Sequence, residues 1–400
     1  MDLTAYQPAE PHAPAKLRLA AAVETARAEI IDLSRRIHAN PEPAFEEHQA
    51  ARWVAEIVAR HGYAVEHPAG SLETAVRGRL RGGRGDGPRV GILAEYDALP
   101  GIGHACGHNT MAAAGVGAAI ALASLAADLP GEVVFLGTPA EERGSGKEIM
   151  IRDGLFEGLD AALLFHPGDI TEIEAVLLAS EDIDVVFNGR AAHAASEPWD
   201  GLNALDALVL LFTSIGLWRQ QLHPDARVHG IVLEGGQAAN VIPERTAGRF
   251  MIRSADEKRF GAMRERFEDL VRAAALATGC TQTVTHAGLS RTMRHNRVLG
   301  ARFAANLAPY GLVEDQPTGN RGSSDMGNVS HLCPAIHPTL AICERGTPGH
   351  SVAFREAAAS PRAQEVTLIA ATVIAQTAYE LLTDPDLVAA AWREFHGGRS

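Results

Sequence analysis

Residues 91–127 read GILAEYDALPGIGHACGHNTMAAAGVGAAIALASLAA, and this stretch decides the fold. It opens on an apolar run typical of a buried strand, passes through a Gly- and His-rich loop at 99–109, and ends in an Ala-rich segment. Segment 110–127 is slightly short of the ~20 strongly apolar residues that a membrane span needs, and it is built from small residues. We therefore expect a strand, a loop and a buried helix lying close against a sheet, and no membrane contact.

Strands and helices alternate around this stretch. The patterns predict strands at 73–79, 89–94, 132–137 and 161–165, and helices at 16–38, 47–60, 147–153, 363–382 and 384–395. Such alternation indicates an α/β sheet with helices on both faces. Between 182 and 286 the order becomes β-α-β-β-α-β, which is typical of the ferredoxin-like unit. We expect one α/β domain formed by 1–180 and 294–400, interrupted by a smaller α+β domain at 181–293.

The composition excludes several classes of protein. Among 400 residues, 36 Lys and Arg stand against 49 Asp and Glu, a formal net charge of −13. Such a chain lacks the basic field that nucleic acid or an anionic membrane attracts. The first fifteen residues hold three Pro and neither a basic start nor an apolar core, unlike a signal peptide. Four Cys are too few for a disulfide framework, so we expect a cytoplasmic protein.

The loop carries three potential metal ligands within five residues. Cys106 and His108 flank Gly107, and His104 lies just before them. Because Gly lets the backbone turn tightly, a thiolate and an imidazole one residue apart can meet one centre. A buried structural Cys beside unrelated His residues is the simpler alternative. The density of ligand types favours a metal site.

Two adjacent carboxylates, Glu141 and Glu142, follow the next strand, VVFLGTP. Alone, such a pair indicates a solvated turn. Neighbouring side chains point in different directions, however, so one carboxylate can bind a metal while the other takes a proton from water that the metal acidifies. Because open α/β sheets place their ligands at the carboxyl ends of strands, this pair and the Cys-Gly-His loop are expected at one edge.

Two further histidines stand at comparable positions, one at the end of the strand LLFHPG and one in the Gly/Pro loop GTPGHSVAF. The candidate ligands are thus Cys106, His108, Glu142, His166 and His350. Five ligands are too many for one tetrahedral site with an open position, but they suit two metals that share a bridge. The sequence therefore favours a two-metal centre.

Seven segments, in order along the chain, resemble the peptidase M20 family of metallopeptidases and amidohydrolases. They are HANPEPAFEE, AEYDALPGIGHACGHN, GTPAEE, FHPG, GRAAHAA, GGQAANVIPE and GTPGHS. They are most similar to its amidohydrolase branch, which carries a Cys-Gly-His metal motif, and within it to β-alanyl-lysine-type dipeptidases and aminobenzoyl-glutamate hydrolase subunits. The resemblance implies a two-metal, aminopeptidase-like α/β catalytic domain and a ferredoxin-like lid domain that also forms a homodimer.

The resemblance also implies a division of the ligands. Cys106 would bridge two metals, His108 with His166 would complete one site, and Glu142 with His350 would complete the other. Because the bridge is a thiolate rather than the Asp of other branches, the metal identity stays open. Zn or Mn is expected, with Co or Ni as alternatives.

Other roles are implied in the same way. Glu141 would be the general base and acid, and Asp97 would support the metal site from beneath. His193 and Asn240 match lid positions that contact the substrate or its oxyanion in relatives, sometimes from the partner subunit. Glu95 stands near the strand position from which other branches draw a metal-binding His.

The implied reaction is hydrolysis of an amide bond in a small dipeptide or N-acyl amino acid. An anionic substrate approaching a chain at −13 needs local positive charge. Arg253 is a candidate carboxylate clamp, with pairing to Asp256 or Glu257 as the alternative.

Other functions remain open from the residues. Within the same class the alternatives are an N-acyl-amino-acid amidohydrolase (aminoacylase) and an aminobenzoyl-glutamate-type hydrolase. A hydrolase with Cys106 as nucleophile, assisted by His108 or His104, and a non-catalytic protein that keeps the fold are alternatives from other classes.

Overall fold

The computed structural model describes residues 12–316, 319 and 322–397. The chain forms two compact units. The first comprises Met1–Val176, Arg294–Arg321 and Asn328–Ser400, and the second comprises Leu177–Met293 and Gly322–Gly327. The unit boundaries thus lie a few residues from the expected 180/181 and at the expected 293/294, and residues 322–327 belong to the second unit rather than the first.

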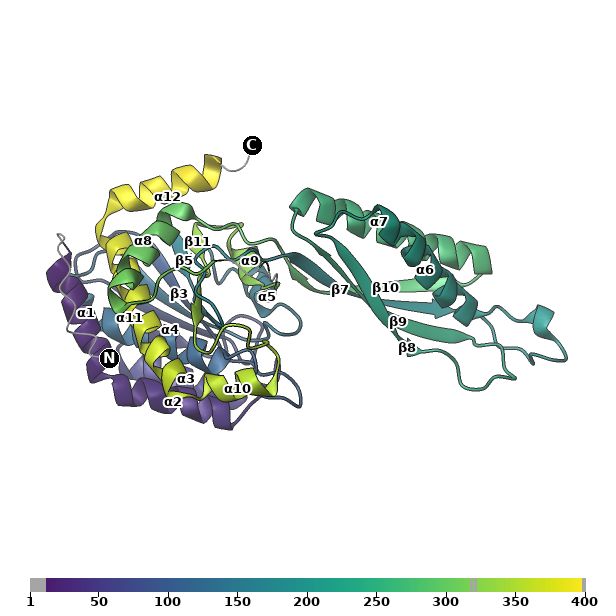
Figure 1. Ribbon diagram of the computed structural model, residues 1–400, viewed down its shortest axis with the longest axis horizontal. Coiled ribbons are helices and arrows are strands. Elements are labelled where there is room, and N and C mark those ends of the chain that lie inside the picture. The colour runs from purple at the N-terminus through teal and green to yellow at the C-terminus, as the bar shows by residue number, and fades with distance from the viewer. Residues whose placement is uncertain (1–11, 317–318, 320–321, 398–400) are drawn as a thin grey trace. The chain divides into compact units, whose positions relative to one another are not determined.

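A six-stranded sheet in the order β1-β2-β4-β3-β5-β11 forms the centre of the first unit (Figure 1). Its strands are β1 (Ala64–Glu66), β2 (Val76–Arg81), β3 (Arg89–Glu95), β4 (Glu132–Thr138), β5 (Ala161–Leu163) and β11 (Ala335–Ile336). The four strands from β4 to β11 run parallel, whereas β1 and β2 are antiparallel to their neighbours. A separate parallel pair joins β6 (His166–Gly168) to β12 (Thr339–Ala341). This is the mixed α/β fold that the sequence predicts.

Helices surround this sheet. They are α1 (Ala13–Thr25), α2 (Arg27–Ala39), α3 (His48–Arg60), α4 (His108–Ala123), α5 (Gly146–Arg152), α8 (Arg297–Leu307), α10 (Val352–Ala358), α11 (Pro361–Thr383) and α12 (Pro385–Gly397). The short α9 (Met326–Val329) lies where the chain passes from the second unit back to the first. Among the described residues only α11 is long and apolar enough to cross a bilayer, and 89% of that window is buried inside the protein, as expected for a core helix.

The Ala-rich helix α4 packs unusually close to the sheet because its residues are small. A Cβ at Gly115 would lie 2.7 Å from the Leu93 carbonyl oxygen and 2.9 Å from Ala94 Cβ. Overpacking of this kind typically costs about 1–3 kcal/mol. The composition of α4 therefore fixes its distance from β3, and with it the position of the first helical residue, His108.

The register of the parallel strands brings their carboxyl ends together. Glu95, the last residue of β3, pairs with Thr138, the last residue of β4. The predicted strand 161–165 is split, because β5 ends at Leu163 and the chain continues as β6, which pairs with β12. This break carries His166 out of the main sheet at the same edge.

The second unit contains an antiparallel sheet in the order β10-β7-β9-β8 with two helices. Its elements are β7 (Ala179–Asn188), α6 (Ala204–Trp218), β8 (Arg227–Glu234), β9 (Arg245–Ser254), α7 (Glu257–Thr278) and β10 (Thr281–Ser290). This order of elements and strands is that of the ferredoxin-like β-α-β-β-α-β unit. The unit has its own core, in which Phe250 packs on Phe212 and Phe267 with ring centroids 5.0 and 5.2 Å apart.

Candidate metal centre

The Cys-Gly-His turn depends on Gly107. Its φ is +82°, in the left-handed region, and a Cβ there would lie only 2.6 Å from Pro167 Cγ. Glycine alone satisfies both the backbone conformation and the close approach. Because α4 begins at the next residue, the turn places the Cys106 thiol on the loop and the His108 imidazole on the rigid end of a helix.

Asp97 orients the His108 ring. Nδ1 of His108 lies 2.9 Å from the Asp97 carbonyl oxygen and 3.0 Å from its Oδ1, so this nitrogen carries the proton and donates. The opposite nitrogen, Nε2, is buried and has no hydrogen-bond partner among the described residues. Metal-binding histidines are held in this way, with one nitrogen donating and the other left as a lone pair.

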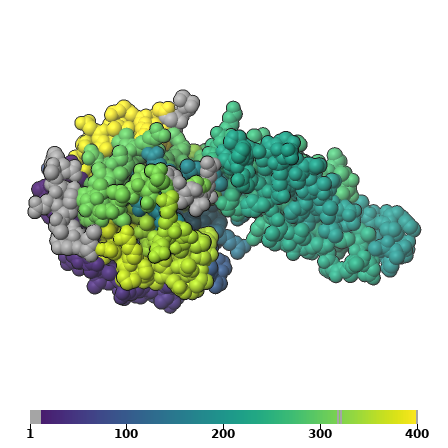
Figure 2. Space-filling model, viewed as in Figure 1, coloured from purple at the N-terminus to yellow at the C-terminus, as the bar shows by residue number. Residues whose placement is uncertain are grey.

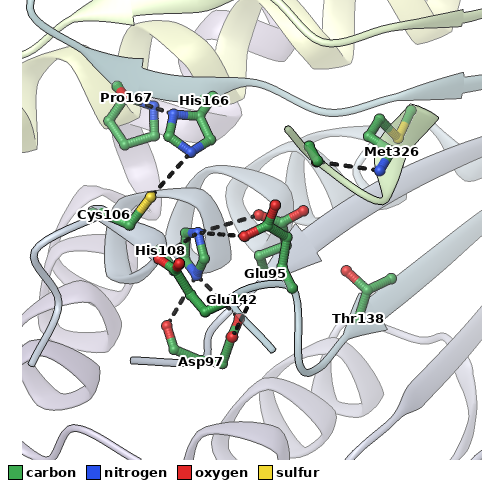
Figure 3. A network of polar contacts seen from close by, with 12 residues as sticks. Glu95, Asp97, Cys106, His108, Thr138, Glu142, His166, Pro167 and Met326 are labelled. Atoms are coloured by element: carbon green, nitrogen blue, oxygen red, sulfur yellow. Dashed lines mark hydrogen bonds and ion pairs between the residues drawn. The ribbon is translucent and has the colours of Figure 1, made fainter. Parts of the chain in front are cut away.

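His166 faces the thiol from the start of β6. Its Nδ1 donates to the Pro167 carbonyl at 2.7 Å, which leaves Nε2 3.4 Å from Cys106 Sγ (Figure 3). Two ligand atoms on a tetrahedral ion, one N at ~2.0–2.1 Å and one S at ~2.3 Å, lie about 3.5 Å apart. The separation in this structure therefore fits a metal held between the two side chains.

The turn after β4 brings both of its carboxylates to the His108 imidazole. Ala140, a non-glycine residue at φ +58°, precedes the pair. Oε2 of Glu142 lies 3.6 Å from Nε2 of His350, while Oε2 of Glu141 lies 3.8 Å from Nε2 of His108. Oε1 of Glu142 lies 4.0 Å from the same Nε2, so both carboxylates border His108, and Glu142 also reaches His350.

Two backbone hydrogen bonds position Glu142 and His350. The backbone N–H of Glu142 donates to Asp97 Oδ2 at 2.9 Å, so a single carboxylate holds two candidate ligands. His350 adopts φ +55°, and its N–H donates to the Ala105 carbonyl at 3.0 Å. The His350 side chain is 57% exposed, so the centre is open to solvent on this side.

The predicted ligands fall into two groups that share the thiol. The groups are Cys106 with His108 and His166, and Cys106 with Glu142 and His350. In each group the ligand atoms lie within 4.8 Å of one another. The unpartnered, buried Nε2 of His108 and Oε1 of Glu142 are consistent with bound cations. The arrangement fits two metals with a Cys bridge, and the ligand assignment itself stays a prediction.

The electrostatics of the centre favour a cation. Burial, together with the charge of Glu142, raises the pKa of the Cys106 thiol well above its usual value. Burial lowers the pKa of His166 to about 4. Burial would raise the pKa of Asp97, but the charge and hydrogen bond of His108 lower it overall. A divalent ion would stabilise the thiolate that the buried site otherwise disfavours.

His104 lies outside both groups. It is buried, its ring stacks on His38 with centroids 6.2 Å apart, and burial lowers its pKa to about 3. The imidazoles close to the Cys106 thiol are those of His166 and His108 instead. Of the three potential ligands in the loop, the structure thus groups two.

The two predicted lid residues lie beside each other in the second unit. Both side chains are exposed, and the Ala194 N–H donates to the Asn240 carbonyl at 3.0 Å. Nδ1 of His193 accepts from the backbone N–H groups of Ala195 at 3.2 Å and Ser196 at 3.3 Å. With Nδ1 acting as acceptor, a neutral His193 carries its proton on Nε2, where it can donate.

Arg253 pairs with neither of its alternative partners. Its Nη1 donates to Ser323 Oγ at 3.1 Å, and burial lowers its pKa. The carboxylate of Asp256 caps α7, while Glu257 accepts from Arg291 Nε at 2.7 Å. The charge of Arg253 is therefore not paired with Asp256 or Glu257, the alternative that the sequence left open.

Three buried polar residues near the centre are assigned no role from the sequence, although one of them, Glu47, ends the segment HANPEPAFEE. Lys147 in α5 pairs with Glu95, Glu47 accepts from the turn before Glu141, and His337 packs against His166 with ring centroids 5.5 Å apart. Glu95, the partner of Lys147, does stand out in the sequence through its position at the end of β3. The other three become visible only in the folded chain.

Cys, His and carboxylate ligands at the carboxyl edge of an α/β sheet, with a spare carboxylate beside them, define a metal-dependent hydrolase. The family model of peptidase family M20/M25/M40 matches residues 91–391, and the chain belongs to this family. This confirms the resemblance seen in the sequence. The chain is a metal-dependent dipeptidase or amidohydrolase that acts on amide or peptide bonds.

Similar proteins place the chain in the amidohydrolase branch. It is 39% identical over 403 residues to an Xaa-Arg dipeptidase of Mus musculus, covering 95% of this chain and 92% of the relative. It is 31% identical over 314 residues to a subunit of the p-aminobenzoyl-glutamate hydrolase of Escherichia coli, covering 73% of this chain and 65% of the relative.

Solved structures share the fold. An aminobenzoyl-glutamate utilization protein from Klebsiella pneumoniae superposes with a TM-score of 0.73 at 19% identity, covering 91% of this chain and 97% of the other. A dinuclear metal-binding M20 peptidase from Bacillus subtilis gives a TM-score of 0.66 at 21% identity, covering 90% and 99%.

Proposed function

We propose that this chain is a two-metal dipeptidase that cleaves dipeptides with a basic C-terminal residue. The two ligand groups that share Cys106 are the observation that carries the two-metal part. The identity of 39% to an Xaa-Arg dipeptidase, over nearly the full length of both chains, supports the substrate class. A chain at −13 also attracts a cationic side chain more readily than an anionic one.

The ligand groups define which residues would hold the ions. Cys106 would contact both, with His108 and His166 on one side and Glu142 and His350 on the other. Two divalent ions would polarise the scissile carbonyl and lower the pKa of water. A thiolate with imidazoles suits zinc, and the carboxylate also admits manganese, with cobalt or nickel as alternatives.

Glu141 is the general base and acid in this proposal. Its carboxylate borders the centre, with Oε2 3.8 Å from His108 Nε2, and its side chain is 10% exposed. It takes a proton from water as the water oxygen bonds to the carbonyl carbon, and it delivers this proton to the amide nitrogen as the C–N bond breaks and the amine leaves. Asp97 holds His108 and the Glu142 backbone in place while this proton moves.

The second unit supplies the contacts to the substrate. We propose that His193 donates from Nε2 to the oxyanion, because its Nδ1 already accepts from two backbone N–H groups. Asn240, on the adjacent loop, would add a polar contact. Arg253 would bind the C-terminal carboxylate of the dipeptide through its guanidinium.

We also propose a homodimer formed through the second unit. β8 is an edge strand, and Ile231, Val232 and Leu233 on it are 60%, 52% and 51% exposed. Helix α6, drawn in teal in Figure 2, adds the exposed Leu217 at 72%. Unpaired apolar edges of this kind are templates for pairing with another chain.

Light scattering tests this assembly. The Val232→Lys variant is expected to run at the monomer mass of 42.4 kDa and the native chain at twice that value. Lys at Leu276 on α7, which is 86% exposed, is the control for a charge placed elsewhere on the unit. A monomeric native chain would remove the dimer proposal.

We propose a cytoplasmic location, which the four free cysteines support. Fractionation of cells that express the chain at native level tests it. Recovery outside the cytoplasm would contradict it.

A substrate series tests the function. The chain, loaded with zinc or manganese, is assayed on dipeptides ending in Arg or Lys, on dipeptides ending in Glu or Leu, on N-acetyl amino acids and on p-aminobenzoyl-glutamate. We expect the highest kcat/KM for the basic dipeptides. Higher values for the N-acetyl amino acids or for p-aminobenzoyl-glutamate would replace this proposal with the corresponding alternative.

Chelation separates the metal mechanism from a thiol nucleophile. Removal of metal with EDTA is expected to abolish turnover, and zinc or manganese is expected to restore it. A Cys106 nucleophile would keep its activity in EDTA and lose it on alkylation.

A further inference from the structure

A buried ion pair lies directly behind the metal centre. Nζ of Lys147, in α5, approaches Oε1 of Glu95, at the end of β3, to 2.5 Å, and both side chains are fully buried. Removing the charges of a Lys and a Glu from water is unfavourable for each ion. Such a pair is therefore expected to hold a side chain in one required position.

The second oxygen of Glu95 has no hydrogen-bond partner. Oε2 is buried and unpartnered among the described residues, and it lies 3.4 Å from Nε2 of His108, which is also unpartnered. Because His108 donates from Nδ1 to Asp97, its Nε2 presents a lone pair when the ring is neutral. Burial would lower the pKa of His108, but the charges of Cys106 and Asp97 raise it well above its usual value, so in the metal-free chain a proton on Nε2 faces Glu95 Oε2. A bound ion would take the place of this proton, because a histidine binds a metal only after it has released it.

The same oxygen belongs to a third group of potential ligands. Glu95, His108 and Glu141 each offer a ligand atom within 4.8 Å of the others. The distance of 3.4 Å between Glu95 Oε2 and His108 Nε2 also agrees with the spacing of about 3.4 Å between O and N ligands on one tetrahedral ion. Figure 3 shows Glu95 and His108 facing each other.

We propose that Glu95, held by Lys147, is a sixth metal ligand that supplies Oε2 to the ion on His108. The inference rests on the two-metal centre proposed above. Lys147 donates to Oε1, so Oε2 is the oxygen that Glu95 would offer to an ion. The lysine charge also offsets one of the carboxylates around His108, which keeps the site from accumulating excess negative charge when the ion is released.

Metal titration of matched variants tests this role. The full-length chain is stripped with chelator, and zinc is titrated by calorimetry into the wild type, Glu95→Gln and the double variant Glu95→Gln/Lys147→Met. The control is Glu380→Gln, which breaks another buried pair, Lys16 Nζ to Glu380 Oε1 at 2.8 Å, far from the ligands in the sequence. Melting temperatures of the stripped proteins report the structural cost of each change.

We expect one of the two ions to bind at least ~10-fold more weakly to Glu95→Gln and equally weakly to the double variant, with Glu380→Gln unchanged. The double variant removes the lysine charge together with the carboxylate charge, so it decides the question even if Glu95→Gln fails to fold. Wild-type affinity in the double variant would show that Glu95 only balances Lys147 and would overturn the inference. A wild type that binds no zinc or manganese would instead overturn the proposed function itself.

Discussion

Oε1 of Glu47 accepts a hydrogen bond of 2.8 Å from the backbone N–H of Ala140. Ala140 has φ +58°, which costs a non-glycine residue about 1–3 kcal/mol and persists only where its surroundings impose it. The other oxygen, Oε2, accepts from Thr74 Oγ1 at 2.8 Å. A buried carboxylate from the start of α3 therefore holds the turn that directs Glu141 into the centre.

Glu47→Ala is expected to lower kcat/KM by ~10–100-fold, because it leaves the Ala140 N–H buried without an acceptor, at a cost of about 1–3 kcal/mol. Glu47→Gln keeps an acceptor at Oε1 and is expected to lose less than ~5-fold. Steady-state kinetics on the best dipeptide, with metal content measured in parallel, checks both. Equal activity of the two variants would contradict the role of this hydrogen bond.

The same carboxyl predicts a pH dependence of stability. Burial, with the charge of Asp97, raises the pKa of Glu47 to about 7 from 4.5 in the unfolded chain. The folded state therefore binds the Glu47 proton more tightly than the unfolded chain does. The contribution of this proton to the free energy of unfolding is complete below pH 4.5 and is lost as the pH rises toward 7, at up to ~1.4 kcal/mol per pH unit. Urea unfolding of the metal-stripped chain at pH 5 and 7 should show a smaller change for Glu47→Gln than for the wild type.

Glu141→Ala is expected to retain both metals and to lose at least ~100-fold in kcat, because it removes the proton acceptor and no assigned ligand. Elemental analysis together with kcat separates these effects. Near-wild-type turnover would remove the base assignment, and loss of metal would show that Glu141 is itself a ligand.

Cys106→Ser is expected to weaken metal binding at both sites, since a hydroxyl is a poor substitute for the bridging thiolate. Cys343→Ser is the matched control, because this thiol is also free and half-buried but lies in neither ligand group. Elemental analysis after dialysis measures the outcome. Equal metal content in the two variants would count against the bridge.

Gly107→Ala is expected to reduce both stability and metal affinity. It places a Cβ 2.6 Å from Pro167 Cγ at a φ of +82°. Gly101→Ala is the control, because Gly101 has a similar φ of +75° and nothing within 4 Å of its Cβ position. Both variants carry the backbone strain of about 1–3 kcal/mol, and only Gly107→Ala should also lose metal. Chemical unfolding and zinc titration of both distinguish strain from close approach.

The sequence predicted the parts of the fold that depend on local pattern. The Ala-rich run became the buried helix α4, and the strand-end positions of Cys106, Glu142 and His166 brought them to one edge of the sheet. These predictions succeed because strand ends and parallel register translate directly into position. The boundaries were less accurate. The predicted helix 16–38 is divided at Ala26, where no Pro or Gly marks the break.

The supporting contacts could not be predicted. Glu47 meets Ala140 and Lys147 meets Glu95 across long stretches of chain, and no spacing rule connects them. His104 had the residue type and the proximity expected of a ligand, yet its ring turns toward His38. The local sequence pattern predicts which backbone segments come to the site. The direction of each side chain depends on packing that forms only in the folded chain.

The second unit lies between the candidate ligands in the sequence, so the ligands before it are synthesised earlier than His350. On the ribosome, the group of Cys106, His108 and His166 is synthesised before the second unit, and His350 follows only after it. About 240 residues separate Cys106 from His350, on the order of tens of seconds of translation at ~5–20 residues per second. The residues of this group are thus all synthesised first, but β6, which begins with His166, pairs with β12 only after the second unit has been made. The strand partner that holds His166 and the ligand His350 therefore arrive together, late in translation.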